Sequence, residues 1–482
     1  MQYETKVEPW KHQLTALEKM RGKEAFALLM AMRTGKTKVT CDDFGRLELT
    51  GKCQDLLVIA PAGVYRTWET AFETHLSTDL QERIVIYTWS ASQNGTTATN
   101  LLEKFLAIRD RPRALLVNIE ALSGVERART LCKTFLGQRR SMAVIDESTS
   151  IKSPTAQRAK FAVNFLAPLA EYRRILSGLP TPRSPLDLYQ QFAYLDPRIL
   201  GFGSYFGFRN RYAVIKRAPF GPNQRMVPIV VGYRDVDKLW AKLQPHAFRV
   251  NLEDCYDLPP KMYSFRTVEL TPEQQRAYAD MRHFSTTELG KGDFVTATQV
   301  IVQLLRLHQI LCGHVGTEDG RTIEIPEKRT ETLLDLLEEH DGKAIIWCSY
   351  DLDVRKVSEA IAKHFKTKVA RFWGGNRNSR EDEEKMFLTD PDCRHIVATA
   401  AAGGRGRTWT VADLVVYYSN SPDLEHRSQS EERAQGVDKV KSVAYVDLIA
   451  RGTVDERMIK ALRQKISMAS TITGDNYKEW LI

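Results

Sequence analysis

Short, continuously apolar runs recur along the chain and predict buried β-strands. In the first half they lie at 55–60, 84–87, 115–118, 142–146 and 174–177. The second half repeats the pattern at 343–347, 369–372, 395–399, 414–418 and 444–448. Continuous apolar runs, as opposed to alternating ones, are typical of parallel strands that are buried on both faces. Helical patterns separate the runs, so the sequence predicts an α/β protein with two parallel-sheet lobes.

The segment between the two lobes has a different texture. The glycine-rich stretch 201–207 and the basic, proline-containing stretch 216–228 predict loops. Thr271, Pro272 and Gln274 predict a helix start with a capping box. Val300, Ile301, Leu304, Leu305 and His308 fall on one helical stripe. We therefore predict a first lobe at 1–197, a mostly helical insertion at 198–325 and a second lobe at 326–482.

A phosphate-binding loop is predicted where the apolar residues 26–29 run into Met32-Arg33-Thr34-Gly35-Lys36-Thr37. A strand, a tight turn and a helix start place backbone N–H groups and the positive end of the helix dipole against phosphates. Lys36 is then expected to reach the β- and γ-phosphates, and the Thr37 hydroxyl to hold Mg²⁺. Met30 stands where the usual motif has its first glycine, so a chance match stays open from this stretch alone.

Two acids follow the apolar run that ends at Ile145. In a phosphate-binding ATPase, the first acid at such a strand end, here Asp146, binds Mg²⁺. The second, Glu147, can orient and deprotonate the attacking water. The alternative is an exposed acidic turn, which the preceding Gly35-Lys36-Thr37 and the following 151–153 disfavour.

Composition narrows the class of protein. The 482 residues are 43% hydrophobic and 27% charged, and the net charge of +9 favours a polyanionic partner such as nucleic acid. No apolar run is long enough for a membrane span, and the start lacks a signal-peptide core. Seven cysteines without a CxxC pair predict reduced thiols in the cytoplasm and no zinc ribbon. His308, Cys312 and His314 lack a fourth ligand for structural zinc, so a packed helix is the better interpretation.

The chain contains a series of short motifs from its N-terminus to its C-terminal part. They include WKHQ near the N-terminus, MRTGKT, VIAPAGVYRTW, DESTSIKS, LSGLPTP, LPPK, LRLHQILCGH, AIIWCSY, TAAAGGRGRTWT and QSEERAQG. In this order the chain resembles the Swi/Snf-type ATPases of helicase superfamily 2, and the resemblance runs across nearly the whole chain.

The resemblance implies two RecA-like lobes with ATP and Mg²⁺ bound in the cleft between them. Gln13 matches the residue that reads the adenine. Thr34, Gly35, Lys36, Thr37 and Asp146 match the nucleotide-binding residues, with Thr37 and Asp146 as Mg²⁺ ligands. Glu147 matches the catalytic acid. Arg433 matches the arginine finger, a side chain that stabilises charge on the γ-phosphate.

Some residues depart from the family pattern. Arg33 replaces a glycine, which makes the loop start less permissive of positive φ. Leu179 replaces a threonine, and Gly436 stands where a second arginine is expected. Arg405 or Arg407 can supply that charge, or both can bind the nucleic-acid backbone.

The predicted DNA contacts lie at strand ends and loops that match the family's nucleic-acid motifs. They are Arg66, Trp68, Asn118, Thr399, Arg405, Thr408 and Trp409. For the tryptophans, core packing is the alternative to stacking on a base.

The sequence therefore predicts an ATP-dependent translocase on DNA, double-stranded or branched, in the cytoplasm of a bacterium or a phage-infected host. Two alternatives stay open. One is a helicase that unwinds or branch-migrates forks and junctions, and the other is a DNA-binding scaffold with a silent ATPase site.

Overall fold

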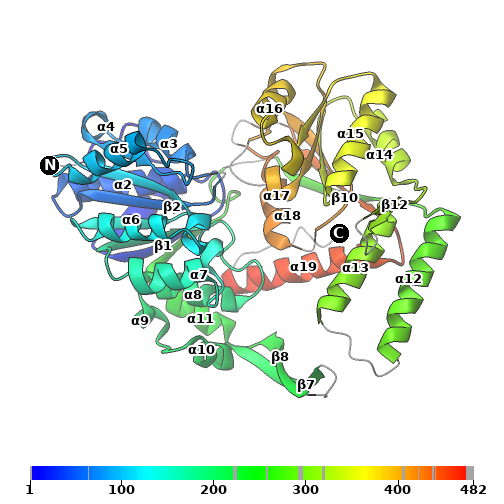
Figure 1. The fold of residues 1–482 in the computed structure, drawn as a ribbon, viewed down its shortest axis with the longest axis horizontal. Helices are drawn as coiled ribbons and strands as arrows, with labels where there is room; N and C mark the ends of the chain where they lie inside the picture. Colours follow the sequence, from blue (N-terminus) through cyan, green and yellow to red (C-terminus); the bar gives the residue numbers. More distant parts are fainter. Residues whose placement is uncertain are drawn as a thin grey trace. The chain divides into compact units, whose positions relative to one another are not determined.

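Two compact units make up the chain (Figure 1). The computed structural model describes residues 3–62, 64–220, 225–256, 259–290, 297–316, 321–403, 408–421, 423–436, 439 and 441–473. The first unit consists of Met1–Ala213, Tyr233–Asp257 and Met468–Asp475. The second consists of Val214–Gly232, Leu258–Ser467 and Asn476–Ile482. Each unit is built around one parallel sheet, which confirms the predicted α/β class.

The sheet of the first unit has the order β3-β4-β2-β5-β6-β1-β9, and its strand pairs are parallel. Its strands are β1 (Ala25–Met30), β2 (Asp55–Ala60), β3 (Val85–Thr88), β4 (Arg113–Asn118), β5 (Ser141–Ile145), β6 (Tyr172–Leu176) and β9 (Ala247–Val250). The five apolar runs predicted in the first half are confirmed as β2 to β6, with small shifts at their ends. Strand β9, at the edge beside β1, was not predicted.

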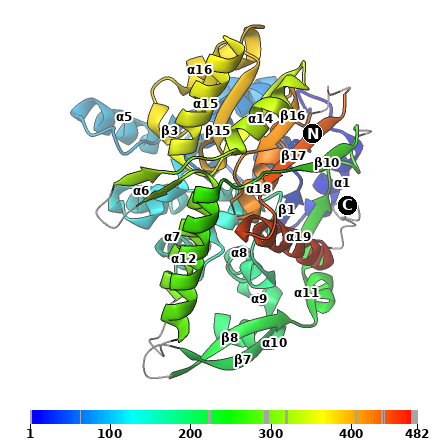
Figure 2. The same cartoon turned by 90° about the vertical axis from the view of Figure 1, so that its right-hand side faces the viewer.

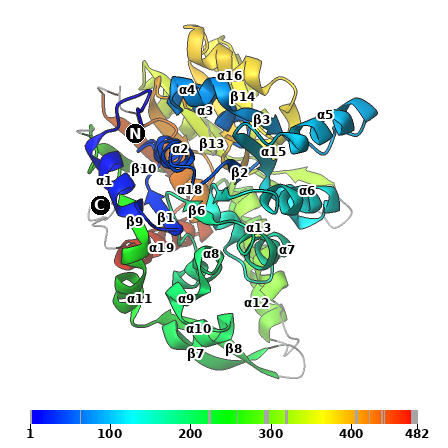
Figure 3. The ribbon, with the colours of Figure 1, turned by 90° about the vertical axis from the view of Figure 1, so that its left-hand side faces the viewer.

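Helices cover both faces of this sheet, because alternate side chains of a strand point to opposite faces. Phe26, Leu28 and Met30 of β1 join a core with residues of α1 (Lys11–Met20), α2 (Lys36–Leu49) and α3 (Thr67–His75). Ala27 and Leu29 point the other way and are equally buried. The remaining helices of this unit are α4 (Thr78–Arg83), α5 (Thr96–Ala107), α6 (Glu126–Leu136), α7 (Gln157–Phe161), α8 (Leu188–Leu195), α9 (Pro197–Leu200), α10 (Tyr205–Tyr212) and α11 (Val236–Leu243) (Figure 3).

The sheet of the second unit has the order β10-β17-β16-β13-β15-β14 and is also parallel. Its strands are β10 (Lys261–Thr267), β13 (Lys343–Cys348), β14 (Val369–Phe372), β15 (His395–Thr399), β16 (Ala412–Tyr417) and β17 (Val443–Ile449). All five runs predicted in the second half are confirmed as strands. The edge strand β10 was missed, since its side chains are mostly exposed and it carries no continuous apolar run.

The same alternation builds two cores in the second unit. Ala344 and Ile346 of β13 pack with α14 (Arg329–Glu338) and α15 (Asp351–Phe365). Ile345 and Trp347 pack on the opposite face with Phe387 of α16 (Arg380–Thr389). The shorter helix α17 (Ala400–Gly403) follows β15, and α18 (Leu424–Glu431) follows β16.

The segment between the sheets combines helices with short strands. It contains α12 (Pro272–Gly290), α13 (Ala297–Leu311) and the short strands β11 (His314–Gly316) and β12 (Thr322–Glu324). The predicted capping box at the start of α12 is confirmed, because the Gln274 backbone N–H donates to Thr271 Oγ1 over 3.1 Å and the Thr271 N–H donates to Gln274 Oε1 over 3.2 Å.

One prediction in this segment is wrong. The stretch 216–228, predicted as a loop, falls largely in β7 (Ala213–Phe220) and β8 (Arg225–Tyr233), which form a two-stranded sheet. The β-branched residues 229–231 favour a strand despite the nearby prolines. The predicted helical stripe lies on α13, where His308 is buried and Leu304 and Leu305 are half exposed.

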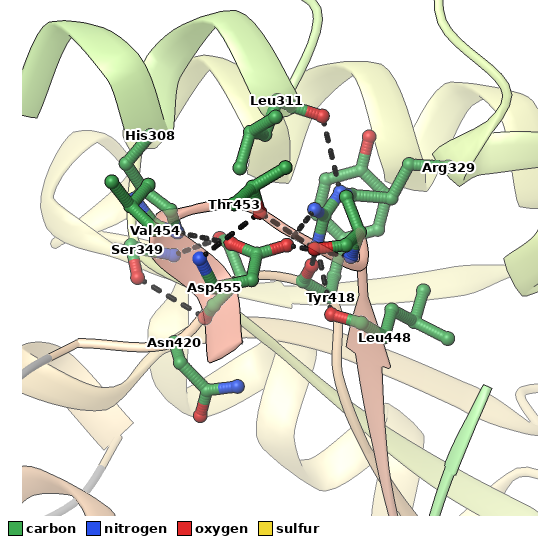
Figure 4. A network of polar contacts seen from close by, with 12 residues as sticks. His308, Leu311, Arg329, Ser349, Tyr418, Asn420, Leu448, Thr453, Val454 and Asp455 are labelled. Carbon is green, nitrogen blue, oxygen red and sulfur yellow. Dashed lines mark hydrogen bonds and ion pairs between the residues drawn. The ribbon is translucent and has the colours of Figure 1, made fainter. Parts of the chain in front are cut away.

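A buried arginine joins several elements of the second unit (Figure 4). Arg329 donates to the carbonyl oxygens of Leu311 (3.1 Å), Tyr418 (2.7 Å) and Leu448 (3.0 Å). It also pairs with the carboxylate of Asp455, on α19 (Val454–Thr473). One guanidinium therefore fastens α13 and α19 to the carboxyl ends of β16 and β17.

The three possible zinc ligands that the sequence offered, His308, Cys312 and His314, lie close to this junction. His308 Nδ1 lies 2.7 Å from the Tyr350 hydroxyl, and burial lowers the pKa of His308 to about 4. Cys312 and His314 are also buried. In the described part of the chain, no group of three His, Cys, Asp or Glu side chains is placed to hold a metal ion. The described helices also include none that is long and apolar enough to cross a membrane.

Candidate functional site

The predicted phosphate loop connects β1 to α2 in the first unit. Gly35 stands at the N-cap of α2 with φ +87°, a conformation that glycine adopts at no steric cost. Arg33 also has a positive φ, +64°. The loop therefore keeps a left-handed turn at the position where the family's glycine is replaced. For a residue with a side chain, that turn costs on the order of 1 kcal/mol.

Helix α1 is fastened to this loop through Gln13. Gln13 Nε2 donates to the Thr34 carbonyl oxygen over 3.1 Å, and Gln13 Oε1 accepts from the Trp10 N–H over 3.0 Å. A Cβ atom at Gly35 would stand only 2.2 Å from Gln13 Nε2. A larger residue at position 35 would therefore displace the Gln13 amide, in addition to straining the left-handed backbone. His12 Nε2, which the sequence did not single out, lies 2.7 Å from the same Thr34 oxygen.

Lys36 opens α2 and holds the loop from inside. Its Nζ donates to the carbonyl oxygens of Met30 (2.9 Å) and Ala31 (3.1 Å). The ammonium therefore lies at the carboxyl end of β1, and the first backbone N–H groups of α2 lack partners within the helix. Thr37 follows in the first turn. A cation, a helix N-terminus and a hydroxyl thus gather at one edge of the sheet, as anion binding requires.

Asp146 lies at the same edge, directly after β5. Its backbone N–H donates to the Ile59 oxygen over 2.8 Å and so extends the strand pairing. Its carboxylate accepts from Trp68 Nε1 (3.0 Å) and from the Glu147 N–H (2.9 Å). Burial raises the pKa of Asp146, and the positive charge of Lys36 opposes this rise. Lys36 and Asp146 are therefore within electrostatic reach of each other.

Glu147 adopts a left-handed conformation with φ +47° and begins the turn 148–151. The next residue links this turn to the segment around Leu179. Ser148 Oγ donates to Gln191 Oε1 over 2.7 Å, and Gln191 Nε2 donates to the Pro180 oxygen over 2.8 Å. Sequence reasoning missed Gln191. The signal was a polar residue on an otherwise apolar helix, and Gln191 is fully buried.

The residues at this edge fit a magnesium-bound triphosphate. Mg²⁺ prefers oxygen ligands and keeps several waters, so one carboxylate and one hydroxyl suffice from the protein. Asp146 and Thr37 offer these two groups. The buried Asp146 carboxylate receives two hydrogen bonds, and the charge of Lys36 opposes the rise of its pKa, an environment that a divalent ion can share.

The predicted arginine finger lies in the second unit. Arg433 follows α18 and is 3% exposed. Its Nε donates to the Gln429 oxygen over 2.8 Å, and its own carbonyl oxygen accepts from the Trp409 N–H over 2.9 Å. Arg405 and Arg407, the alternative sources of the charge, lie outside the described residues.

The predicted DNA contacts differ in exposure. Trp68 is buried in the core of the first unit, where it binds Asp146. Trp409 is buried in the second unit, stacks on Trp347 at 5.4 Å between ring centroids and donates to Glu384 over 2.7 Å. Neither ring presents a face to solvent, so the core-packing alternative describes both side chains in this structure.

The remaining members of the predicted set lie at loop and strand ends. Arg66 and Thr408 are exposed. Asn118 ends β4 and accepts the Ala121 N–H over 2.8 Å, and Thr399 ends β15 with little exposure. Asn118 and Thr399 thus lie at the carboxyl ends of their strands, in different units.

Comparisons with known proteins identify the family of this chain. The SNF2-related domain family matches residues 17–315, and the helicase conserved C-terminal domain matches 328–436. A relative from Xenopus tropicalis, the SWI/SNF-related matrix-associated actin-dependent regulator of chromatin subfamily A-like protein 1, is 25% identical over 423 residues, which cover 86% of this chain and 40% of the relative. The mouse DNA annealing helicase and endonuclease ZRANB3 is 25% identical over 361 residues, covering 73% of this chain and 32% of the relative.

Among solved structures, the Sulfolobus solfataricus SWI2/SNF2 ATPase core in complex with dsDNA is 21% identical, with a TM-score of 0.43 and coverage of 98% of this chain and 95% of that one. This chain spans less than half the length of the two curated relatives. Because the SNF2-related domain alone matches more than half of the residues, the resemblance seen in the motifs is confirmed, and the chain belongs to the SNF2-related family of helicase-type ATPases.

Proposed function

We propose that this protein is a DNA-dependent ATPase that couples ATP hydrolysis to translocation along duplex DNA. The observation that carries the proposal is the placement of Lys36 and Asp146 at the carboxyl edge of the first parallel sheet, where the charge of Lys36 acts on the Asp146 carboxylate. A cation at a helix start and a buried carboxylate at the end of a strand in the same sheet are two groups that a magnesium-bound triphosphate needs. Membership of the SNF2-related family supports the same reaction class.

In this proposal Lys36 exchanges its loop carbonyl partners for the β- and γ-phosphates. Thr37 and Asp146 would hold Mg²⁺, which would supply positive charge against the phosphate oxygens. Gln13, fixed beside Gly35, would recognise the adenine. Gln13 of α1 and Lys36 of α2 both bind carbonyl oxygens of the same loop. Binding of a nucleotide to the loop would therefore change the contacts of both helices.

Hydrolysis further needs a base and a charge that stabilises the transition state. Glu147 is positioned by the strained turn after β5 to orient the attacking water and take its proton. Arg433, from the second unit, supplies the positive charge as the γ-phosphate is transferred. Because the base and the arginine belong to different units, turnover would depend on how the units move, as a motor requires.

DNA is the proposed track because the net charge of +9 suits a polyanion and because relatives carry DNA activities in their names. Arg66 and Thr408 are exposed and can contact phosphates. Asn118 and Thr399 are the two other described candidates, and Arg405 completes the proposed set.

A second candidate is a helicase acting on forks or junctions, which the mouse relative's name, an annealing helicase, favours. A third is a scaffold with a silent ATPase site. The geometry of Lys36, Asp146 and Glu147 argues against the scaffold, since a silent site has no need of a strained turn or a buried carboxylate.

Steady-state ATP hydrolysis by the purified protein tests the three candidates. It would be compared without nucleic acid and with single-stranded DNA, blunt duplex, forked DNA, a four-way junction and RNA. Stimulation by blunt duplex supports the translocase. Stimulation by forks or junctions alone moves the assignment to the helicase, and no hydrolysis with any of them leaves the scaffold.

A further inference from the structure

The β7–β8 ribbon is an unusual surface. Strands β7 and β8 pair only with each other and join neither large sheet (Figure 2). Val214, Met226, Ile229, Val230 and Val231 expose between 38% and 52% of their surface. A two-stranded ribbon without a covering layer is marginally stable in water, and exposed apolar clusters mark interaction sites.

Both faces of this ribbon are apolar. Ile229, Val230 and Val231 are consecutive, so they point alternately to opposite faces of the ribbon, and each is at least 38% exposed. A strand that lies on a protein core buries every second side chain. At 229–231 this ribbon does not, so both of its faces are open to a partner.

All the charged residues of the ribbon are basic. Between Ala213 and Arg234 the chain contains Lys216, Arg217, Arg225 and Arg234 but no aspartate or glutamate. Lys216 and Arg217 are exposed and, being consecutive, also point to opposite faces. Each face thus offers aliphatic surface together with a cation.

A partner that fits must present apolar plates and anions on both sides. Unpaired nucleotides do so, because the base is a flat apolar surface and the phosphate beside it is an anion. An intact duplex hides its base faces in the stack and offers only phosphates and groove edges. Base faces become available on two sides at once where the strands of a duplex separate.

We propose that the β7–β8 ribbon lies between the two strands of forked DNA and contacts unpaired bases of one strand on each face. The proposal rests on the DNA track proposed above and deepens it, because it names the DNA structure that this protein recognises. It also supplies a physical element for strand separation.

The test is a set of equilibrium binding measurements without ATP, by fluorescence anisotropy, on a fork, a blunt duplex of equal length and a single strand. The Arg234 N–H donates to the Tyr212 oxygen over 2.9 Å, so the ends of the ribbon are adjacent and residues 214–232 can be replaced by a short Gly-Ser turn. Ile229→Ser with Val231→Ser strips one face, and Val230→Ser strips the other. Lys216→Ala with Arg217→Ala removes one cation from each face of β7.

Matched controls come from α5, where Leu101 is 55% exposed and Lys104 is also exposed. Leu101→Ser and Lys104→Ala change the same surface chemistry at a site without the ribbon's arrangement. Thermal unfolding of every variant is expected to match the parent protein, because the ribbon belongs to neither sheet core.

The ribbon-less protein and the Ile229→Ser, Val231→Ser variant are expected to bind the fork about tenfold or more weakly, since burying an aliphatic side chain against a base typically changes affinity by about that much. Their affinity for blunt duplex stays within about twofold, and the α5 controls bind both DNAs as the parent does. Unchanged fork affinity in the ribbon-less protein overturns the proposal, as does an equal loss on fork and duplex.

Two further outcomes separate this inference from its rivals. If the ribbon-less protein keeps its fork affinity and falls from a dimer to a monomer in sedimentation, the ribbon binds a second copy of the chain and the proposal is wrong. Absence of ATP hydrolysis on any DNA would defeat the proposed function, but fork binding without ATP still reports on the ribbon.

Discussion

At the scale of single residues, the loop after β1 and the turn after β5 carry the proposed chemistry. Lys36 has a structural partner in each of two loop carbonyls, so its removal loosens the loop as well as losing a cation. Glu147 stands on a strained turn that a substitution to glutamine preserves. The two positions therefore allow binding and turnover to be separated.

Lys36→Ala and Glu147→Gln are both expected to abolish ATP hydrolysis while DNA affinity stays close to that of the parent. In Glu147→Gln the water loses its base, and general bases contribute about 10²- to 10⁴-fold to rate. The measurements are steady-state hydrolysis with saturating duplex and DNA binding without nucleotide. Nucleotide binding should survive in Glu147→Gln but weaken in Lys36→Ala. Normal turnover in either variant would show that the site has been misassigned.

Gln191 is a positioning residue in the proposed mechanism, because it bridges Ser148 and the Pro180 oxygen. Gln191→Leu keeps the volume but removes the hydrogen bonds with Ser148 Oγ and with the carbonyl oxygens of Pro180 and Asp187, each worth about 1 kcal/mol. We expect DNA stimulation of the ATPase to fall about tenfold while hydrolysis without DNA changes little. Gln190→Leu, its buried neighbour with one long bond of 3.5 Å to the Ala159 oxygen, is the control. If ATP hydrolysis falls equally with and without DNA, Gln191 supports only the folded structure and does not position the site for DNA stimulation.

At the scale of elements, the Arg329 junction shows how α13 and α19 are attached to the second sheet. The guanidinium is fully buried and has four partners from four different elements or their ends. Its removal leaves the Asp455 carboxylate in a buried place without its cation. Loss of one member of a buried pair typically costs about 3–5 kcal/mol.

Arg329→Met is therefore expected to destabilise the second unit by about that amount, measured as the free energy of unfolding in urea. Lys328→Met, next to it and half exposed, should change stability by less than about 1 kcal/mol. The double variant Arg329→Met with Asp455→Leu should recover part of the loss, because an apolar pair carries no buried charge. If Arg329→Met unfolds like the parent, the junction does not hold the unit together.

Strands with a continuous apolar run were predictable from the sequence, including the edge strands β3 and β14. β2 and β15 were found because every one of their residues is buried. β9 buries only Ala247 and Phe248, β10 exposes most of its side chains, and β7 and β8 pair with each other outside both large sheets, so none of them shows the pattern of a fully buried strand. Their strand conformation depends on pairing partners far away in the sequence, which a local pattern does not contain.

The same distinction applies to the candidate site. Lys36, Asp146 and Glu147 were recognisable because a loop motif and a strand end are local signals. Gln191, His12 and the burial of Trp68 were not, because each depends on a contact between distant segments: Trp68 and Asp146, for example, are 78 residues apart. Arg33 shows the converse, since the sequence predicted a less permissive loop and the backbone nevertheless adopts a positive φ.

At the scale of the whole molecule, the proposed reaction depends on both units. Arg433→Ala is expected to lower turnover about 10³-fold or more, as the loss of an arginine finger does, while nucleotide affinity changes little. Arg451→Ala, an exposed arginine of the same unit, is the control. Because Arg433 is buried, thermal unfolding has to show that the variant is folded. Loss of turnover in Arg405→Ala but not in Arg433→Ala would assign the finger to the glycine-rich motif.

The net charge of +9 makes a prediction for the complex with DNA. Each phosphate that a lysine or arginine neutralises releases a counterion, so the logarithm of affinity should fall linearly with the logarithm of salt concentration. Arg66→Ala should reduce the magnitude of this slope by about one, because it removes one phosphate contact. Arg140→Ala, which breaks only an exposed pair with Glu171, should leave the slope unchanged.

Duplex binding at a series of salt concentrations provides the measurement. The test separates the proposed backbone contacts from the ribbon contacts, since apolar contacts with bases respond weakly to salt and phosphate contacts respond strongly. Variants of Ile229 and Val231 should therefore shift fork affinity equally at all salt concentrations, whereas Arg66→Ala should change the slope on fork and duplex alike. A salt dependence close to flat for the parent protein would contradict the view that this chain holds DNA through its phosphates.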